Sequence, residues 1–412
     1  MRRVVITGIG VVSPIGHGRE VYWNALAAGK NGIGPVTLFD TTDFPVRIAA
    51  EVRDFDAGLY MDRKEIRRSD RVIHFSVAAA AMAVEDAKLD EGSLDRTRYG
   101  VYIGSGEGGI STTNENYRIL YEKGPTRISP FFIPMMISNM PAAYVAMVHG
   151  AKGPNLSVVT ACATATNTIG EAYYAILRDD ADVILTGGAE AAIVPIALAG
   201  FAAAKTLSTR NDEPEKASRP FDVDRDGFVM GEGAGVLVLE ELEHAKNRGA
   251  RIWGEIVGYG ATCDAYHITA PSPDGDGQIR AMAMAVRKAG WRKEDVELIN
   301  AHGTSTPLND KTESLAIRTL FGDYTDKLLV NSTKSLVGHG LGAAGALETI
   351  AAIQSLVEGI VHPTLNLDSK DPECDVPVVG KEAIHVPIRH VLVNNFGFGG
   401  HNGVLALTRF EE

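Results

Sequence analysis

The residue with the clearest chemical potential in this sequence is Cys162, which follows the apolar run 156–160. Residues 163–177 have a helical composition, so Cys162 is predicted at a strand-to-helix turn, at the helix N-terminus. The unpaired N–H groups and the positive end of the helix dipole favour a thiolate there. One of those N–H groups can also donate to an oxyanion on a substrate carbonyl. Cys162 is therefore a candidate nucleophile, with an inert buried cysteine as the alternative.

Two histidines occupy comparable positions after predicted strands. His302 directly follows the run 298–301, and His339 lies between a strand and the helix expected at 343–358. Glycines flank both residues, so backbone or substrate can approach closely. Because ligands bind outside the carboxyl ends of strands in open α/β sheets, Cys162 and both imidazoles are expected to converge. A purely structural role is the alternative for each histidine taken alone.

A glycine-rich segment at 394–400, which contains Phe396 and Phe398, also follows a strand. Such a turn exposes backbone N–H groups and can supply a second oxyanion donor. It can equally be a hairpin turn into the last strand, 403–408, and the two interpretations are compatible.

The elements that must position these groups alternate along the chain. Apolar runs rich in β-branched residues alternate with alanine-rich stretches, which is typical of sheets covered by helices on both faces. The clearest predicted strands are 3–7, 99–103, 156–160, 183–186, 235–239, 298–301, 328–332 and 390–395. The clearest predicted helices are 75–86, 163–177, 310–321 and 343–358. A charged stretch at 240–251 predicts a division into two α/β units, 1–250 and 251–412.

Composition excludes several classes of protein. The chain has 412 residues, 45% of them hydrophobic, and a formal net charge of −12, which argues against a nucleic-acid binder. Its three cysteines are too few for a disulfide framework and favour a reducing compartment. The segment 104–109 matches GxGxxG, but no second strand with an acidic end follows, so a dinucleotide site is not expected. No Walker A, CxxC or HExxH pattern occurs.

Targeting and membrane signals are also lacking. The apolar run after Met1 is too short for a signal peptide, and the longest apolar stretch, 191–204, is interrupted by Pro195 and Gly200. We therefore expect a cytoplasmic protein without membrane insertion.

Taken together, these segments resemble the β-ketoacyl-[acyl-carrier-protein] synthases, the elongating condensing enzymes of fatty-acid synthesis, and in particular the type II enzymes of the dissociated bacterial pathway. The resemblance spans the chain from 4–10 to 397–400 and is carried by the motifs at 160–162, 300–306 and 334–339. It implies an α/β thiolase fold, with two similar α/β halves stacked in five alternating α-β-α-β-α layers. It also implies a homodimer.

The resemblance assigns roles to the motif residues. Cys162 corresponds to the nucleophile that accepts an acyl chain from acyl carrier protein, and His302 and His339 to the pair that binds the malonyl thioester oxygen during decarboxylation. Lys334 matches the lysine that supports the histidine site, and Glu313 an acidic structural residue. The backbone N–H groups of Cys162 and Phe398 correspond to the oxyanion hole, and Phe398 also to an aromatic gate.

Further positions are implied for substrate and carrier. Thr304 and Thr306 resemble hydroxyls that bind the phosphopantetheine arm, Phe201 an aromatic residue of the acyl pocket, and Phe396 a substrate contact. Glu107 stands where related enzymes place an apolar or small pocket residue; we expect it to shorten the pocket or to hydrogen-bond across the dimer interface. The residues predicted to dock carrier protein, or alternatively to form a solvated basic face, are Lys64, Arg67, Arg68, Arg127 and Lys205.

The implied reaction is a decarboxylative condensation that forms 3-oxoacyl carrier protein, by an acyltransferase that needs no metal or organic cofactor. Two imidazoles that each donate through a ring N–H can hold the enolate oxygen, and a dipole-stabilised thiolate needs no dedicated base. The alternatives are a polyketide ketosynthase, a non-catalytic chain-length factor, a thiolase, an initiating Cys-His-Asn enzyme and a hydrolase built from Cys162, His302 and Asp310. The presence of the thiol and both histidines disfavours a chain-length factor and an initiating enzyme.

Overall fold

The computed structural model describes residues 2–411, and most of its strands belong to one 11-stranded sheet with two repeats of the same topology. Each half contributes five strands, named below. If these five are numbered 1 to 5 along the chain, they lie side by side in the order 3-2-4-5-1 in both halves. Strands 3, 2 and 4 are parallel, while 4–5 and 5–1 are antiparallel. The first half comprises β1 (Val4–Ser13), β5 (Tyr99–Gly104), β6 (Asn155–Leu156), β7 (Val183–Glu190) and β8 (Gly233–Glu241). The second comprises β9 (Gly254–Cys263), β10 (Leu298–Asn300), β11 (Leu329–Asn331), β14 (His390–Gly397) and β15 (His401–Thr408).

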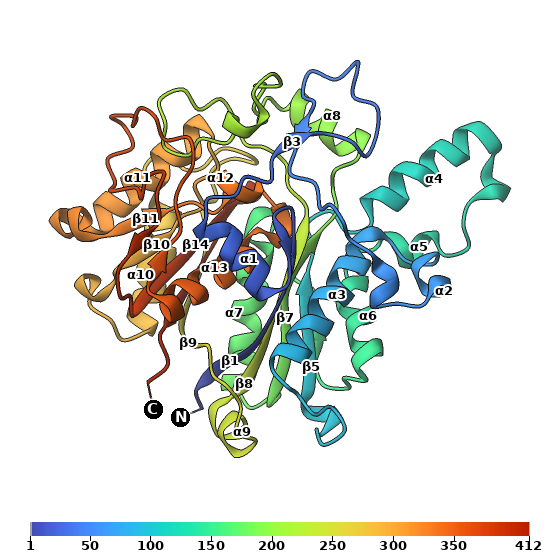
Figure 1. The fold of residues 1–412 in the computed structure, drawn as a ribbon, viewed down its shortest axis with the longest axis horizontal. Helices are drawn as coiled ribbons and strands as arrows, with labels where there is room; N and C mark the ends of the chain where they lie inside the picture. Colours follow the sequence, from blue (N-terminus) through green and yellow to red (C-terminus); the bar gives the residue numbers. More distant parts are fainter. Residues whose placement is uncertain (1, 412) are drawn as a thin grey trace.

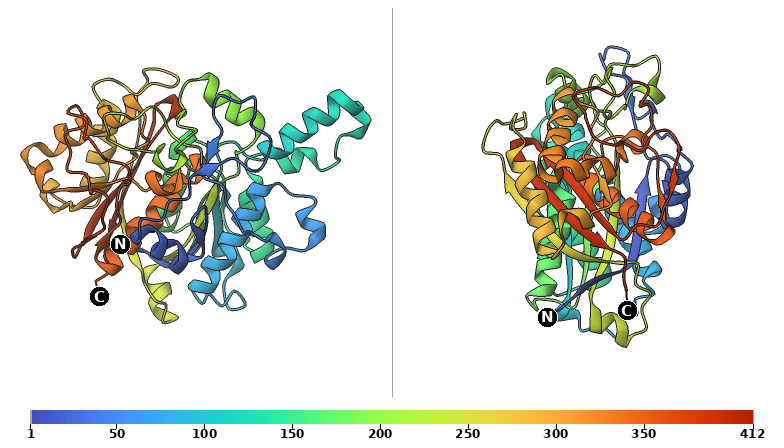
Figure 2. Two further views of the ribbon diagram at one scale, coloured as in Figure 1. Left: turned by 45° about the horizontal axis from the view of Figure 1, so that its top comes forward. Right: turned by 90° about the vertical axis from the view of Figure 1, so that its left-hand side faces the viewer.

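The two half-sheets are joined where β1 pairs with β9 over Val4–Ile6. Helices α7 (Thr164–Leu177) and α13 (Ala344–Glu358) pack against each other and against strands of both halves (Figures 1 and 2). Helices α3 (Arg71–Asp86) and α6 (Met140–His149) cover the outer side of the first half. Helices α10 (Asp276–Lys288) and α11 (Pro307–Phe321) cover the second. The predicted thiolase fold of five alternating layers is confirmed. The division at 250/251 remains a prediction, and its outer bounds, residues 1 and 412, lie outside the described residues.

Small residues allow the two central helices to approach closely. Almost every residue of α13 is buried, and a Cβ on Gly345 would lie 2.1 Å from Thr166 Oγ1 of α7. The alanine-rich sequence of α13 therefore reflects a helix enclosed by two sheets and another helix, rather than an amphipathic surface helix.

The remaining elements lie mostly around this core. Helices α4 (Ile110–Lys123) and α5 (Phe132–Met136) project from the first half (Figure 1). The other helices are α1 (Arg19–Ala27), α2 (Arg63–Ile66), α8 (Pro195–Ala203), α9 (Leu242–Asn247) and α12 (Lys334–Val337). The short strands are β2 (Gly16–His17), β3 (Gly34–Pro35), β4 (Ile48–Ala49), β12 (Ile360–Val361) and β13 (Ile384–His385). Between residues 2 and 411, no helix is long and apolar enough to cross a membrane.

The predicted strand 156–160 was too long, since only Asn155–Leu156 is a strand. β6 lies at the end of the sheet and pairs with β5 on one side. The chain already turns at Thr160, whose backbone N–H donates to Thr164 Oγ1 at 2.8 Å. The turn into α7 therefore begins earlier than the apolar run suggests.

Candidate active site

Cys162 lies in the 3₁₀ turn Ala161–Ala163 directly before α7. Ala161 adopts a left-handed conformation with φ of 50°, which costs an L-residue roughly 1–2 kcal/mol. The segment that begins at Gly397 passes close by, because a Cβ on Gly397 would lie 3.0 Å from Cys162 N. This close approach brings the backbone N–H groups of Cys162 and Phe398 to the Cys162 sulfur.

His302 lies at the carboxyl end of β10, in the segment that leads to α11. Its backbone N–H and that of Gly303 donate to the Glu313 carboxylate at 2.9 and 2.8 Å. Lys334 Nζ donates to His302 Nδ1 at 3.3 Å. Because a lysine ammonium can only donate, Nδ1 is the acceptor and a neutral ring carries its proton on Nε2.

His339 follows α12 and is anchored by its backbone, with its N–H donating to the Val229 carbonyl at 2.7 Å. The N–H of Leu341 donates to His339 Nδ1 at 3.2 Å, so this ring also carries its proton on Nε2. His339 Nε2 is buried and has no hydrogen-bond partner among the described residues. It is therefore a free donor.

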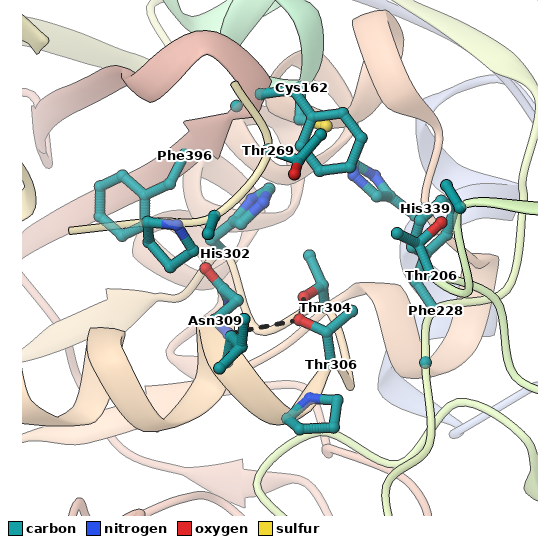
Figure 3. A pocket seen from close by; sticks show the side chains of 18 of the residues that line it. Cys162, Thr206, Phe228, Thr269, His302, Thr304, Thr306, Asn309, His339 and Phe396 are labelled. Carbon is teal, nitrogen blue, oxygen red and sulfur yellow. Dashed lines mark hydrogen bonds between the residues drawn. The ribbon is translucent and has the colours of Figure 1, made fainter. Parts of the chain in front are cut away.

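The three predicted groups meet in one place. Cys162 Sγ and one ring nitrogen each of His302 and His339 all lie within 4.8 Å of one another (Figure 3). The two imidazole rings are 5.4 Å apart between centroids and nearly perpendicular, at 84°. All three line a cavity of about 350 Å³. A thiol that can accept an acyl group thus faces two fixed N–H donors.

Known proteins resemble the chain over its full length. The β-ketoacyl synthase N-terminal domain matches residues 1–245, and the C-terminal domain matches residues 253–368. The chain belongs to the β-ketoacyl synthase family. It is 51% identical to 3-oxoacyl-[acyl-carrier-protein] synthase 2 of Synechocystis sp. over 410 residues, which cover 100% of this chain and 99% of that protein. The enzyme of the same name from Coxiella burnetii is 51% identical over 99% of both chains.

Solved structures share the fold at lower identity. A β-ketoacyl synthase from Burkholderia phymatum superposes on this chain with a TM-score of 0.93 at 37% sequence identity. The ishigamide ketosynthase/chain length factor superposes with a TM-score of 0.94, also at 37% identity, and each comparison covers 100% of both chains. A type II polyketide ketosynthase in complex with its acyl-carrier protein has a TM-score of 0.92 and 33% identity, again with 100% coverage.

A buried charge network supports His302 in this synthase. Lys334 and Glu348, each about 1% exposed, form an ion pair, and Asn395 Nδ2 donates to Glu348 Oε2 at 2.7 Å. Burial and the Lys334 ammonium lower the pKa of both His302 and His339 well below the ordinary histidine value. Both imidazoles are therefore neutral at pH 7. They act as N–H donors through Nε2.

The thiol does not have the depressed pKa that its helix position predicts. Burial raises the pKa of Cys162 to about 12, although Lys334 and the N–H of Phe398 lower it. The fraction of thiolate at pH 7 is then roughly one in 10⁵. The expectation of a depressed thiol pKa is therefore wrong. The Nδ1 lone pairs of His302 and His339 are occupied and their Nε2 atoms carry hydrogens, so reaction of the thiol without a dedicated base remains a prediction.

The protonated Nε2 atoms also bear on metal binding. One sulfur and two imidazole nitrogens form a donor set that suits zinc. Here, however, the Nδ1 lone pairs are occupied by Lys334 and the Leu341 N–H, and the Nε2 atoms carry hydrogens. The arrangement favours binding of an anionic oxygen over binding of a cation.

The structure brings some of the other predicted residues to the cavity. Its lining includes Thr304, Thr306, Phe201, Phe396, Phe398 and Lys205. The hydroxyls of Thr304 and Thr306 lie 2.9 Å apart. Phe201 packs edge-on against Phe228, which in turn packs against His339, with centroid distances of 5.5 and 5.1 Å.

The remaining predicted residues lie elsewhere. Glu107 is exposed in the single chain and is not among the residues that line the cavity. Lys64, Arg67 and Arg127 are exposed, whereas Arg68 is half-buried with its guanidinium 4.6 Å from the centroid of the Phe131 ring.

Sequence reasoning missed Glu348 and Asn395, which hold Lys334 and His302. One signal was present: Glu348 is the only charged residue of α13 before its last residue, Glu358, in a largely apolar, alanine-rich sequence. A charge buried in such a helix requires a partner.

Proposed function

We propose that this synthase condenses an acyl chain held on Cys162 with malonyl-[acyl-carrier protein], to give 3-oxoacyl-[acyl-carrier protein], CO2 and free carrier protein. The observation that carries the proposal is the pair of Nε2–H donors on His302 and His339 in the cavity that contains the Cys162 sulfur. Each half of the reaction has its own groups: the sulfur carries the acyl chain, and the imidazoles hold the malonyl thioester.

The first step transfers the acyl chain to Cys162. The sulfur attacks the thioester carbonyl, the carbonyl re-forms as the bond to the pantetheine sulfur breaks, and the proton lost by the Cys162 thiol is balanced by the proton that the departing pantetheine thiolate takes up. The negative oxygen of the tetrahedral intermediate is held by the backbone N–H groups of Cys162 and Phe398. The acyl chain is then held as a thioester on Cys162, and pantetheine leaves as a free thiol.

The second step forms the nucleophile by loss of CO2 from the malonyl group. The electron pair of the broken C–C bond enters the thioester as an enolate, whose oxygen accepts hydrogen bonds from His302 and His339. Removal of one such donor typically costs ~10²–10³ in rate. The enolate carbon then attacks the acyl-Cys162 carbonyl, the sulfur departs as a thiolate, and one proton taken up by the enzyme restores the thiol.

Fatty-acid elongation is the pathway that the relatives favour. The proteins at 50–51% identity are named 3-oxoacyl-[acyl-carrier-protein] synthase 2, whereas the polyketide-related structures are 33–37% identical. The proposed reaction consumes only two carrier-bound thioesters, so we propose that it needs no metal or organic cofactor. Three free cysteines and the lack of a membrane-spanning helix in residues 2–411 support a cytoplasmic location.

Acyl carrier protein is the proposed partner, and Lys205 is the docking residue with the strongest structural support. It is exposed and lies at the cavity that the phosphopantetheine arm must enter. Thr304 and Thr306 line the same cavity and are proposed to hydrogen-bond the arm. Lys64, Arg67, Arg68 and Arg127 remain candidates for the outer part of the docking surface. A charge reversal at Lys205 should raise KM for the carrier substrate and leave kcat for a pantetheine thioester unchanged.

A homodimer is also proposed, on the basis of the exposed edge of the sheet. β6 pairs only with β5 among the described residues, and Leu156 and Val159 are 42% and 49% exposed beside it. Met147 and Val148 extend this apolar surface on the neighbouring α6, at 63% and 52% exposure. An unpaired apolar edge favours pairing with a second copy. Light scattering should give twice the chain mass, and Leu156→Lys should lower it.

The deciding experiment supplies acyl carrier protein and radiolabelled malonyl carrier protein to the wild-type enzyme and to Cys162→Ala. We expect labelled 3-oxoacyl carrier protein from the wild type alone. Release of free acid without malonyl substrate would indicate a hydrolase. Repeated extension without reduction of the product would indicate a polyketide synthase. Equal condensation by both enzymes would overturn the proposal.

A further inference from the structure

Glu190, the last residue of β7, is a buried carboxylate that takes no part in the proposed reaction. Its Oε2 accepts backbone N–H groups of Gly106 and Gly342, both at 2.9 Å. Its Oε1 accepts the Ser105 hydroxyl at 2.9 Å and the Glu107 N–H at 3.1 Å. No Lys or Arg among residues 2–411 forms an ion pair with it. Four neutral donors therefore satisfy this carboxylate.

The contact to Gly342 links Glu190 to one of the two histidines. Gly342 lies in the 3₁₀ turn Leu341–Ala343, three residues after His339. Leu341, in the same turn, has a strained φ of 47° and donates the N–H that fixes the His339 tautomer. A Cβ on Gly342 would lie 2.6 Å from Glu190 Oε2, so the turn approaches the carboxylate too closely for any side chain.

From this geometry we infer that Glu190 is a positioning residue for decarboxylation, which holds the Leu341–Ala343 turn so that His339 presents Nε2–H to the enolate oxygen. The inference rests on the proposed function. The carboxylate acts through the backbone and does not touch the substrate. Its Oε2 joins the turn after His339 to the β5–α4 turn at Gly106, and no other side chain among residues 2–411 is hydrogen-bonded to both turns.

Ionisation of Glu190 gives this role a measurable signature. Burial raises the pKa of Glu190 to about 7, against the lowering effect of its N–H donors. Protonation would convert one acceptor oxygen of Glu190 into a donor and weaken its hydrogen bonds with the N–H groups of Gly106 and Gly342. The titratable groups that face Glu190 are Glu107 on the β5–α4 turn and Cys162 before α7; the Leu341–Ala343 turn carries none.

The test measures CO2 release from malonyl carrier protein in a Cys162→Ala background, with Glu190 intact or changed to Gln. With Glu190 intact, the rate should rise with pH and level off above about 7, because the carboxylate is the form that holds the turn. His302 and His339 do not titrate in this range, since both pKa values lie well below the ordinary value. Glu190→Gln should show a flat profile, about 10- to 100-fold below the plateau, as expected for loss of a hydrogen bond to a charged group.

Two further variants separate positioning from general damage. Glu313 also has a pKa of about 7 through burial, but it holds the backbone of His302, whose tautomer is fixed by Lys334. Glu313→Gln should therefore keep the pH-dependent rise. Gly342→Ala places a Cβ against Glu190 Oε2 and so disturbs the same hydrogen bond at its donor. This variant should slow decarboxylation with unchanged KM.

The outcomes are distinguishable. If the Cys162→Ala parent releases no CO2, the proposed function fails and this inference fails with it. If the parent is active and Glu190→Gln retains its rate and its pH-dependent rise, only the inference is overturned. In the enzyme that retains Cys162, Glu190→Gln should also speed alkylation of the thiol, because the carboxylate raises the pKa of Cys162.

Discussion

Replacement of Lys334 by Met tests how the buried charge network supports catalysis. The substitution removes the ammonium from Glu348 and the donor from His302 Nδ1 while it keeps most of the side-chain volume. Glu348 would be left as an unpaired buried carboxylate, which costs about 3–5 kcal/mol in the free energy of unfolding. Decarboxylation should fall by ~10²–10³, the loss expected for one misplaced oxyanion donor.

A double variant separates the two effects. Lys334→Met/Glu348→Gln removes both charges together, so its free energy of unfolding in urea should return to within about 1 kcal/mol of the wild type. Decarboxylation should stay low, because the other donor to His302 Nδ1, the neutral Asn395 amide at 3.4 Å, is weaker than the lysine ammonium. Recovery of CO2 release in the double variant, or wild-type release in Lys334→Met, would refute the assigned role of Lys334.

Three other substitutions or titrations examine packing, ionisation and specificity. Gly345→Ala should lower the free energy of unfolding by about 1–3 kcal/mol, because the new Cβ would overlap Thr166 Oγ1. Gly200→Ala is the control, since open space surrounds Gly200, and equal urea midpoints for the two variants would contradict this packing. Alkylation of Cys162 in a Cys263→Ala enzyme should accelerate about tenfold per pH unit from pH 7 to 9, since the thiolate fraction rises below a pKa of about 12; a plateau below pH 8 would contradict the raised pKa. Because Glu107 lies outside the cavity of the single chain, Glu107→Ile should leave the acyl chain-length profile unchanged; a shift toward longer chains would instead assign Glu107 to a pocket completed by a second copy.

The positions of the three reactive groups were predictable because each follows directly from local sequence. Cys162, His302 and His339 lie just beyond strands or strand-like runs, and the carboxyl ends of parallel strands meet at one edge of a sheet. The repeated 3-2-4-5-1 order explains why residues 140 positions apart face one cavity. The fold class followed from the alternation of strands and helices.

Properties set by distant partners were not predictable in this way. The helix N-terminus suggested an acidic thiol at Cys162, but enclosure by the second half of the molecule outweighs that local effect. The ion pair of Lys334 with Glu348 joins α12 to α13, and the contact of Glu190 with Gly342 spans 152 positions. Neither spacing forms a motif. The packing of α12 beside α13 brings Lys334 to Glu348, and the packing of the two halves brings Glu190 to Gly342.

The central claim is that Cys162 carries the acyl chain while His302 and His339 drive decarboxylation. The most direct measurement is release of labelled CO2 from malonyl carrier protein by Cys162→Ala and by a His302→Ala/His339→Ala enzyme, each checked for wild-type folding. We predict that the cysteine variant releases CO2 without condensation, and that the histidine variant releases no CO2 above background. Normal CO2 release by the histidine variant, or its complete loss in Cys162→Ala, would contradict this division of labour.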